Sequence, residues 1–301
     1  MEKTVKGYLM IFISAIGFAL NGVFARILGH DFGVFYQGWV SSAIILVVLL
    51  PIAVKGKFLK PIQKPHRKWF SITIFFSVIS QAPLYLAFNY LTLGTATFIF
   101  FGTFLVTSHA ISWLFLGEKI TKIKIASLII SLVGVFLTFS LSLTIFSLGA
   151  MLLAALSGIA SGGEIATSKK STDSYSSIQL STYSWIFILV THLPLSFITN
   201  EHQLIPSMSV EWYAMLGYAL SALIAFWLVI EGFKYVDASV GSLIGLLEIV
   251  FAAAFGMFFF RDQLSTGVII GGIVILIAAI LPDAYALKTA KEKSTLPPPS
   301  A

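Results

Sequence analysis

Three carboxylates fall inside long apolar stretches of this 301-residue chain: Glu164, Glu231 and Glu248. An ionisable side chain is unfavourable in lipid, so each is a candidate for binding a substrate amine or carrying a proton. Glu231 lies within one turn of the end of its stretch, just before Lys234. Solvation at the membrane surface explains that position, so we assign Glu231 no function.

Glu248 lies among small residues. Gly241, Gly245, Glu248, Ala252 and Gly256 recur at three- and four-residue spacing, which is typical of one helix face packed against another helix or a cavity. At this position the carboxyl could bind a substrate amine or a coupling proton. A buried structural carboxyl, protonated or hydrogen-bonded to a neighbouring helix, explains the pattern equally well.

Glu164 lies on a stripe with Ser157, Ser161 and Ser168. A polar face of this kind suits a water-filled path. Gly158 and Gly162 lie beside the stripe and permit close helix contact. Two lysines, Lys169 and Lys170, follow one turn later, so a structural ion pair is the alternative interpretation.

Four other side chains are candidates for contacting a substrate: Asn21, Gln81, His109 and Trp113. Gln81 precedes Pro83, which bends a helix and frees a backbone carbonyl. His109 titrates near neutral pH and could couple transport to protons. Trp113 could stack on a planar substrate or anchor the chain at the membrane surface. Asn21 could equally tie two helices together.

The composition indicates a membrane protein. Hydrophobic residues make up 57% of the chain and charged residues 11%, whereas a soluble domain carries about 25% charged residues. The chain has no cysteine, which excludes disulfides and cysteine-based metal or redox sites. Its five histidines are scattered without a His-Glu-x-x-His motif, and no Walker-type phosphate loop occurs. We therefore expect no cofactor, no metal and no enzymatic activity.

Ten stretches are long enough to cross a bilayer as helices. They cover residues 8–28, 34–54, 69–91, 95–116, 125–141, 146–167, 178–198, 212–233, 238–260 and 267–287. With the N-terminus in the cytoplasm, every Lys and Arg except Arg26 and Arg261 falls on the cytoplasmic side. The positive-inside rule therefore supports ten spans with both termini cytoplasmic.

The two halves of the chain repeat one another at a separation of 144 residues. Residues 262–265 correspond to 118–121, and Lys170 corresponds to Arg26. Since each half holds five spans, the second half must be inverted relative to the first. We predict an all-α integral membrane protein of ten transmembrane helices in two inverted five-helix repeats, residues 1–143 and 144–287, followed by a disordered cytoplasmic tail, 288–301. Such repeats build secondary transporters with the substrate site between the halves.

Two stretches at this separation carry a family resemblance. The first contains Leu91-Thr92-Leu93-Gly94-Thr95-Ala96, Trp113-Leu114-Phe115-Leu116-Gly117-Glu118-Lys119-Ile120-Thr121 and Ser131-Leu132-Val133-Gly134-Val135; the second contains Tyr235-Val236-Asp237-Ala238-Ser239-Val240-Gly241, Leu247-Glu248, Phe260-Arg261-Asp262-Gln263-Leu264-Ser265 and Gly271-Gly272. Both resemble the duplicated unit of the EamA family in the drug/metabolite transporter superfamily. The resemblance implies ten helices and transport of small metabolites, often export of amino acids or related compounds.

The chain departs from the family pattern in two places. The family often has Glu-Pro in the ninth span, whereas Ile249 follows Glu248 here, and the matching Leu105 is not proline either. The helix bend that the family implies is therefore not predicted here. In addition, Arg261-Asp262 replaces the more usual Gly-Glu.

These observations favour a secondary transporter working by alternating access in a bacterial cytoplasmic membrane. Its partners would be a small-molecule substrate, the lipid bilayer and a proton as one candidate coupling ion, with no nucleic acid; the oligomeric state stays open. A lipid flippase is the alternative. An intramembrane enzyme fits less well, because the Asp residues lie at span ends or in loops.

Overall fold

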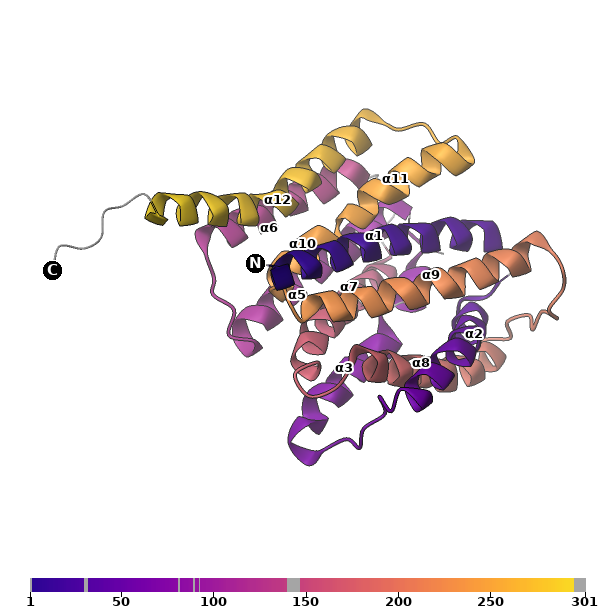
Figure 1. The fold of residues 1–301 in the computed structure, drawn as a ribbon. Coiled ribbons are helices and arrows are strands. Elements are labelled where there is room, and N and C mark those ends of the chain that lie inside the picture. The colour runs from indigo at the N-terminus through magenta and orange to yellow at the C-terminus, as the bar shows by residue number, and fades with distance from the viewer. Residues whose placement is uncertain are drawn as a thin grey trace.

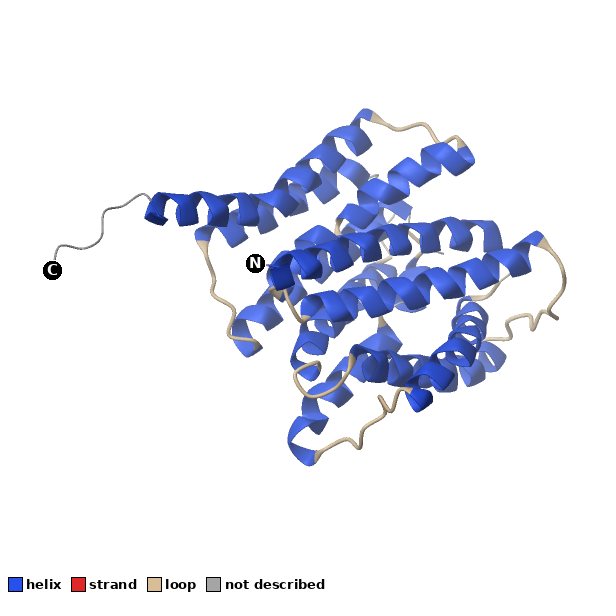
Figure 2. Ribbon diagram, in the orientation of Figure 1, coloured by secondary structure: helices blue, strands red, loops and turns tan. Residues whose placement is uncertain are grey.

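The computed structural model describes residues 2–29, 32–80, 82–88, 90–91, 93–139 and 147–294, and the regular elements of these residues are all helices (Figure 2). The first repeat contains α1 (Glu2–Leu28), α2 (Val34–Lys55), a short 3₁₀ turn η1 (Lys64–His66), α3 (Arg67–Ile79), α4 (Ala82–Ala87), α5 (Leu93–Phe115) and α6 (Lys122–Phe139). The second contains α7 (Leu148–Ser171), α8 (Ser177–Ile198), α9 (Val210–Phe233), α10 (Ala238–Gly245), α11 (Leu247–Phe260) and α12 (Thr266–Ser294).

The helices have the length and composition of membrane spans. Nine helical segments in the described residues meet this standard, and the apolar part of α12, Thr266–Pro282, is a tenth, shorter apolar helix. The predicted all-α fold and the ten spans are therefore confirmed. Two spans are each built from two helices, α3 with α4 and α10 with α11.

Corresponding helices of the two repeats make equivalent packing contacts. Helix α1 packs on α9 and α11, and its counterpart α7 packs in the same way on α3 and α5. The remaining major contacts, α2 with α8 and α6 with α12, each join corresponding helices of the two repeats (Figure 1). Because each repeat crosses the bundle five times, the second begins at the end where the first finishes and is inverted.

Close contacts between these helices depend on small residues. A Cβ atom added at Gly162 would overlap the backbone carbonyl of Phe104, and one at Gly158 would overlap that of Phe100. Helix α7 can therefore approach α5 at backbone distance, as the glycines beside the serine stripe predict.

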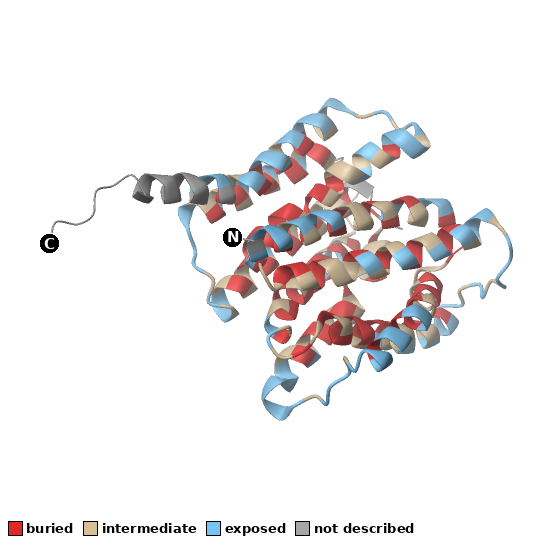
Figure 3. Cartoon of the chain, viewed as in Figure 1, coloured by how far each residue is buried: buried red, intermediate tan, exposed pale blue. Residues whose placement is uncertain are grey.

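The outer surface is apolar, as contact with lipid requires. Large side chains such as Val47, Leu114 and Phe258 are more than 70% exposed, while the buried residues gather on the faces turned toward other helices (Figure 3). At the C-terminal end, α12 continues to Ser294. The predicted disordered tail, 288–301, is therefore helical over its first part, and residues 295–301 lie outside the described part of the chain.

Candidate functional site

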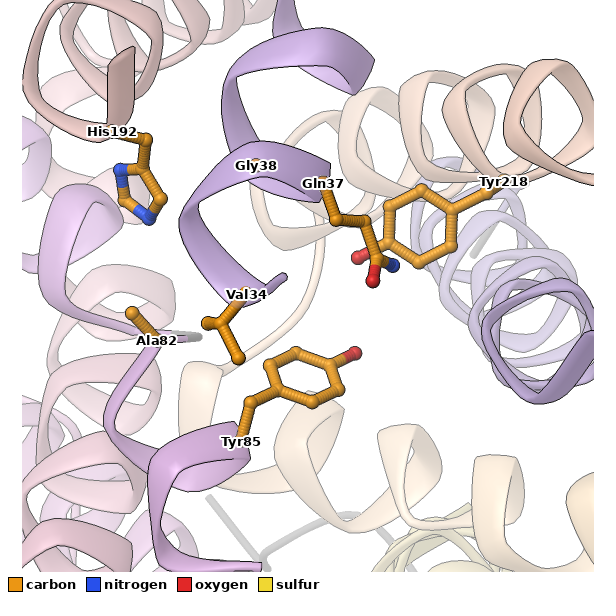
Figure 4. Close-up of a pocket in the computed structure, with 7 residues that line it drawn as sticks. All are labelled: Val34, Gln37, Gly38, Ala82, Tyr85, His192 and Tyr218. Carbon is orange, nitrogen blue, oxygen red and sulfur yellow. The ribbon is translucent and has the colours of Figure 1, made fainter. Parts of the chain in front are cut away.

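A small cavity lies where helices of both repeats meet. It is lined by Val34, Gln37 and Gly38 of α2, Ala82 and Tyr85 of α4, His192 of α8 and Tyr218 of α9 (Figure 4). Its volume is about 10 Å³, which is room for about one water molecule. The lining is polar for a position within a membrane, and α2 and α4 of the first repeat face α8 and α9 of the second.

The most unusual group in this cavity is the amide of Gln37. The side chain is 9% exposed, and its Nε2 atom has no hydrogen-bond partner in the described residues. The phenol groups of Tyr85 and Tyr218 face the same space (Figure 4). A buried donor without an acceptor is unfavourable by about 1–3 kcal/mol, which indicates that Gln37 is positioned for a ligand or a water.

His192 closes one side of the cavity against α2. A Cβ atom at Gly38 would overlap the imidazole ring, so this glycine lets His192 pack directly on the helix backbone. The ring also packs edge-on against Phe35, with a centroid distance of 5.4 Å. His192 therefore serves mainly to shape the wall of the cavity.

Glu248 lies beside this cavity. It is close enough to Tyr85 for their charges to interact, and no described residue donates a hydrogen bond or an ion pair to its carboxyl. A Cβ atom at Gly245 would meet nothing within 4 Å, which shows open space one turn away. Among the described residues no hydrogen bond joins this carboxyl to a neighbouring helix, and a protonated structural carboxyl and a ligand-binding carboxyl both fit this arrangement.

The helix of the ninth span is interrupted next to Glu248, although no proline is present. Helix α10 ends at Gly245 and α11 begins at Leu247, with Leu246 between them. Glu248 consequently lies in the first turn of α11, where a helix favours negative charge. Of the small residues predicted to share one helix face, Gly241 and Gly245 therefore lie on α10, and Ala252 and Gly256 lie on α11 with Glu248.

Asn21 reaches the same region from α1. Its Nδ2 donates to the backbone carbonyl of Tyr218 at 2.9 Å and lies 3.5 Å from Oγ of Ser221. Asn21 therefore ties α1 to α9 directly behind the cavity-lining Tyr218. This contact agrees with the interpretation of Asn21 as a link between helices.

Glu164 is buried in the contact of α7 with α3 and does not pair with the lysines that follow it. Its carboxyl accepts a hydrogen bond from Ser77. Lys169 pairs instead with Glu118 at 3.0 Å, and Lys170 pairs with Asp173 at 3.3 Å. The ion pair considered for Glu164 from the sequence is therefore wrong, and the carboxyl has hydroxyl partners instead.

His109 and Trp113 lie together on α5, and neither lines the cavity of Gln37. Their rings are edge to face with centroids 5.9 Å apart. Nδ1 of His109 lies 2.9 Å from the carbonyl of Leu105, so this nitrogen carries the proton. Both His109 Nε2 and Trp113 Nε1 are buried without a partner in the described residues. Gln81, the remaining candidate, lies outside the described residues.

At one end of the bundle, Glu118 joins the two repeats. Its carboxylate accepts hydrogen bonds from the backbone N–H groups of Ala238 (2.6 Å) and Ser239 (3.2 Å), and from the Ser239 hydroxyl (2.6 Å). This cap satisfies free donors in the first turn of α10. Lys169 of α7 adds an ion pair at 3.0 Å, so Glu118 holds α5, α7 and α10 together.

Lys124 and Asp237 complete what we term the charged cluster: Glu118, Lys124, Lys169 and Asp237. Nζ of Lys124 lies 2.7 Å from the Asp237 carboxylate and 3.8 Å from that of Glu118. Burial acts to raise the pKa of Asp237, but the hydrogen bond from Lys124 and the charges of Lys124 and Lys169 outweigh it and lower the pKa below its usual value.

The opposite end of the bundle has a related contact, which we term the exposed pair. Arg26 of α1 binds Asp262, after α11, through two nitrogens at 2.5 and 3.0 Å. The hydrogen bond from Arg26 lowers the pKa of Asp262 below its usual value. Asp262 corresponds to Glu118, but its side chain is 40% exposed whereas that of Glu118 is 4% exposed.

The backbone around the two acidic residues is also repeated. Gly117 and Arg261, which precede them, both have left-handed conformations, with φ of 68° and 58°. The next N–H bonds back to the carbonyl six residues earlier in both cases, from Glu118 to Ser112 and from Asp262 to Gly256. Arg261 thus adopts the conformation for which glycine is normally chosen.

Sequence reasoning missed Gln37, Tyr218 and Ser77 as functional candidates. Gln37 is a lone amide in an apolar span next to Gly38, and that combination was the available signal. Ser77 and Ser221 are separated by the repeat distance of 144 residues, and both hydrogen-bond a polar side chain on the first helix of the other repeat. The repeat also predicted Lys170 as the counterpart of Arg26, whereas the contacts give that role to Lys169.

Comparisons with known proteins agree with the repeated architecture. The family model described as the EamA-like transporter family matches residues 5–140 and again 148–281. A protein of Clostridium kluyveri named as an uncharacterized transporter is 22% identical over 289 residues, which cover 92% of each chain. A protein of known crystal structure aligns with a TM-score of 0.77 at 14% identity, covering 96% of this chain and 98% of its own, and shows the same fold.

Proposed function

Because this chain belongs to the EamA-like transporter family, we propose that it is a secondary transporter of small metabolites, of the amino-acid type or related compounds, that works by alternating access. One observation carries the proposal. Gln37 Nε2 is buried without a hydrogen-bond partner in the described residues, and no described residue pairs with the partly exposed carboxyl of Glu248 near it. Since an unpaired buried donor is unfavourable, a ligand that pairs with the Gln37 amide gains affinity.

The groups around the cavity suit a substrate with an amine and a second polar group. The Glu248 carboxyl matches an ammonium group, because a charge-assisted hydrogen bond is stronger than a neutral one. Gln37, Tyr85 and Tyr218 offer amide and phenol groups for neutral polar atoms. Their rings and methylene groups provide apolar contact for the rest of a small amphipathic molecule.

Binding of such a molecule requires the helices around the cavity to move. A space for about one water molecule does not hold a metabolite, so this structure represents a closed arrangement. Helices α2 and α8, which pack on each other and line the cavity from the two repeats, are the elements that must separate.

The two ends of the bundle support alternating access. The charged cluster is buried around Glu118 and joins three helices, whereas the related exposed pair is open to solvent. Corresponding contacts in different states are what inverted repeats produce when one conformation is open to one side. We infer that the transport cycle exchanges these states, so that the charged cluster becomes exposed to solvent while the exposed pair becomes buried.

The orientation follows from the distribution of basic residues. With both termini in the cytoplasm, the charged cluster lies on the cytoplasmic side and the exposed pair on the outer side. We place the protein in a bacterial cytoplasmic membrane, and we infer export, driven by the substrate gradient or by protons. Without a phosphate-binding loop in the sequence, ATP is not the energy source we propose.

The test is counterflow in proteoliposomes with a panel of amino acids, amines, nucleosides and sugars. We expect saturable counterflow of an amine-bearing class, with KM raised about ten-fold in Glu248→Gln, equivalent to about 1.4 kcal/mol. Glu211→Gln, an exposed carboxylate at the start of α9, is the matched control and should leave KM unchanged. If no compound exchanges and fluorescent lipid crosses the bilayer instead, the chain is a flippase and the proposal is wrong.

A further inference from the structure

Glu164 is a buried carboxyl whose side-chain partners are hydroxyl groups. It is 7% exposed in α7, and it accepts a hydrogen bond from Ser77. Ser77 also lies 2.9 Å from the hydroxyl of Ser184 on α8. The carboxyl is thus the centre of a hydroxyl network that joins α3, α7 and α8.

The polar contact continues along α3 and α7 toward the end that holds the charged cluster. Oγ1 of Thr73 lies 3.0 Å from the hydroxyl of Thr167 and 2.9 Å from that of Ser171. In the other direction, Ser157 donates to the backbone carbonyl of Ser80. Polar side chains therefore line this contact from the end of α7 to the junction of α3 with α4.

No cation neutralises Glu164 among the described residues. The ionisable side chains on α3, α4, α5, α8 and α9 are Arg67, Lys68, Tyr85, His109, Tyr183, His192, Glu211, Tyr213, Tyr218 and Glu231, and α10 has none. None of them forms a hydrogen bond or an ion pair with Glu164. A buried carboxyl without a neighbouring cation has its hydrogen bonds satisfied in both protonation states only if its partners can donate as well as accept a hydrogen bond.

Ser77 has that property. To a carboxylate, its hydroxyl donates. To a carboxylic acid, it can accept the acid proton while its own hydrogen turns to the backbone carbonyl of Thr73, 3.0 Å away. Gaining or losing one proton at Glu164 therefore changes the direction of a hydrogen bond without leaving a polar group unpaired.

In the corresponding contact of α1 with α9, the hydrogen-bonding side chains among the described residues are an amide and a hydroxyl rather than a carboxyl. There, Asn21 on α1 bonds Ser221 on α9, and Ser221 is the repeat counterpart of Ser77. Asparagine fills the same structural role by hydrogen bonding but binds no proton. An amide such as Asn21 is therefore enough to link two helices by hydrogen bonds. The carboxyl of Glu164 in the second repeat can, in addition, bind and release a proton.

We propose that Glu164 is the proton-binding site of this transporter, separate from the cavity of Gln37 and Glu248. A proton from water on one side of the membrane forms an O–H bond with the Glu164 carboxylate. That O–H bond breaks after the conformational change, and the proton passes to water on the other side. The coupling of this step to a substrate rests on the proposed function, whereas proton binding itself does not.

The link to the substrate cavity runs through Ser80. This residue ends α3, its hydroxyl donates to the backbone carbonyl of Ser77 at 3.0 Å, and two residues later Ala82 of α4 lines the cavity. When Glu164 becomes neutral, the hydrogen bond that it accepts from Ser77 weakens, because a charged acceptor binds more strongly than a neutral one. Ser77 is itself bonded by Ser80 through its backbone carbonyl. Protonation therefore acts on the junction between α3 and α4.

The deciding experiment is an infrared pH titration of carboxyl C=O stretching in the protein reconstituted in lipid. We expect wild type to show a protonated-carboxyl band that Glu164→Gln loses. Glu231→Gln is the matched control, because Lys234 lies 2.5 Å from that carboxylate and holds it ionised. A band that persists unchanged in Glu164→Gln would overturn the proposal. Should that variant unfold, Glu164→Asp must keep the band and shift its titration.

A second measurement tests coupling. For whichever compound of the panel exchanges, we expect Glu164→Gln to keep counterflow but lose accumulation driven by a pH gradient. Accumulation that continues in Glu164→Gln would refute the coupling role. If wild type moves no compound at all, the proposed function fails, and the infrared titration still decides whether Glu164 binds a proton.

Discussion

Nζ of Lys169 lies 3.0 Å from Oε1 of Glu118, and this ion pair joins the end of α7 to the segment that follows α5. The same carboxylate caps α10 through Ala238 and Ser239. One side chain thus connects one helix of the first repeat to two helices of the second. The contact is therefore a candidate for the interaction that keeps this end of the transporter closed.

We predict that Glu118→Gln destabilises the protein by about 1–3 kcal/mol, because Lys169 loses a charged partner and α10 loses a charged cap. Thermal unfolding in detergent measures the loss. We also expect a single cysteine introduced near Ser239 to react faster with a thiol reagent in this variant. The chain has no cysteine of its own, so the background reaction is absent. Equal labelling rates in both proteins would argue against closure by Glu118.

The charged cluster should weaken in acid. The pKa of Asp237 is lowered below the usual 3.8, so its ionised form is favoured by folding. That contribution is present above about pH 4 and is lost as the pH falls through the lowered pKa. The unfolding temperature should therefore hold steady from pH 7 to about pH 5 and fall below about pH 4. In Lys124→Met, which lacks the partner 2.7 Å away, the acid-dependent loss should shrink, and an unchanged profile would show that Asp237 is not responsible.

Gln37→Leu should change the KM of transport without lowering the unfolding temperature. The Nε2 atom of Gln37 makes no hydrogen bond in this structure, so an apolar side chain of similar size removes an unsatisfied donor. We expect unfolding to occur at the same temperature or higher. If the amide binds substrate, the KM of transport should rise about three- to ten-fold, the equivalent of one hydrogen bond. A loss of stability without a change in KM would assign Gln37 a structural role.

The packing of α7 on α5 offers a matched pair of glycine substitutions. Gly162→Ala places a methyl group on the Phe104 carbonyl, and we expect it to destabilise the protein by about 1–3 kcal/mol. In Gly149→Ala, the new methyl group meets only the Ser147 hydroxyl at 4.0 Å, and helix propensity should make it neutral or stabilising. Unfolding temperatures measured side by side check the difference, which similar values for the two variants would contradict.

Arg261→Gly should stabilise the protein. Arg261 has a φ of 58°, and a left-handed conformation is unfavourable by about 1–2 kcal/mol for a residue with a Cβ atom. Its counterpart Gly117 carries no such strain at a φ of 68°, so Gly117→Arg is the reciprocal variant and should destabilise. Unfolding temperatures that move in the same direction for both would mean that side-chain contacts of Arg261, rather than its backbone, decide the outcome.

The sequence was sufficient to predict the ten spans, because an apolar run of bilayer length has few alternatives to a helix. It did not predict the break at Leu246, since no proline or unusual residue marks it. The repeat distance indicated that Glu118 and Asp262 are related, but one residue of difference in α7 moved the ion pair from Lys170 to Lys169. Such a shift depends on which side of a helix faces its neighbour. The constant repeat distance of 144 residues does not contain that information.

The candidate site was harder to predict than the fold. Glu248 and Asn21 were identified because polar groups are conspicuous in apolar helices, and both lie near the cavity. Gln37 and Tyr218 were overlooked, because their importance comes from the packing of α2 against α9 and not from any local pattern. His109 and Trp113 form a pair of their own on α5, which their spacing of one helical turn allowed but did not reveal.

The break at Leu246 gives the ninth span a position at which it can hinge. Glu118 caps the first turn of α10. Helix α11 is a separate helix that has Glu248 in its first turn. The two therefore need not rotate together. A tilt of α11 about Leu246 would move the Glu248 carboxyl toward or away from the cavity while the Glu118 cap of α10 stays in place. Helix α11 could therefore respond to substrate before the charged cluster opens.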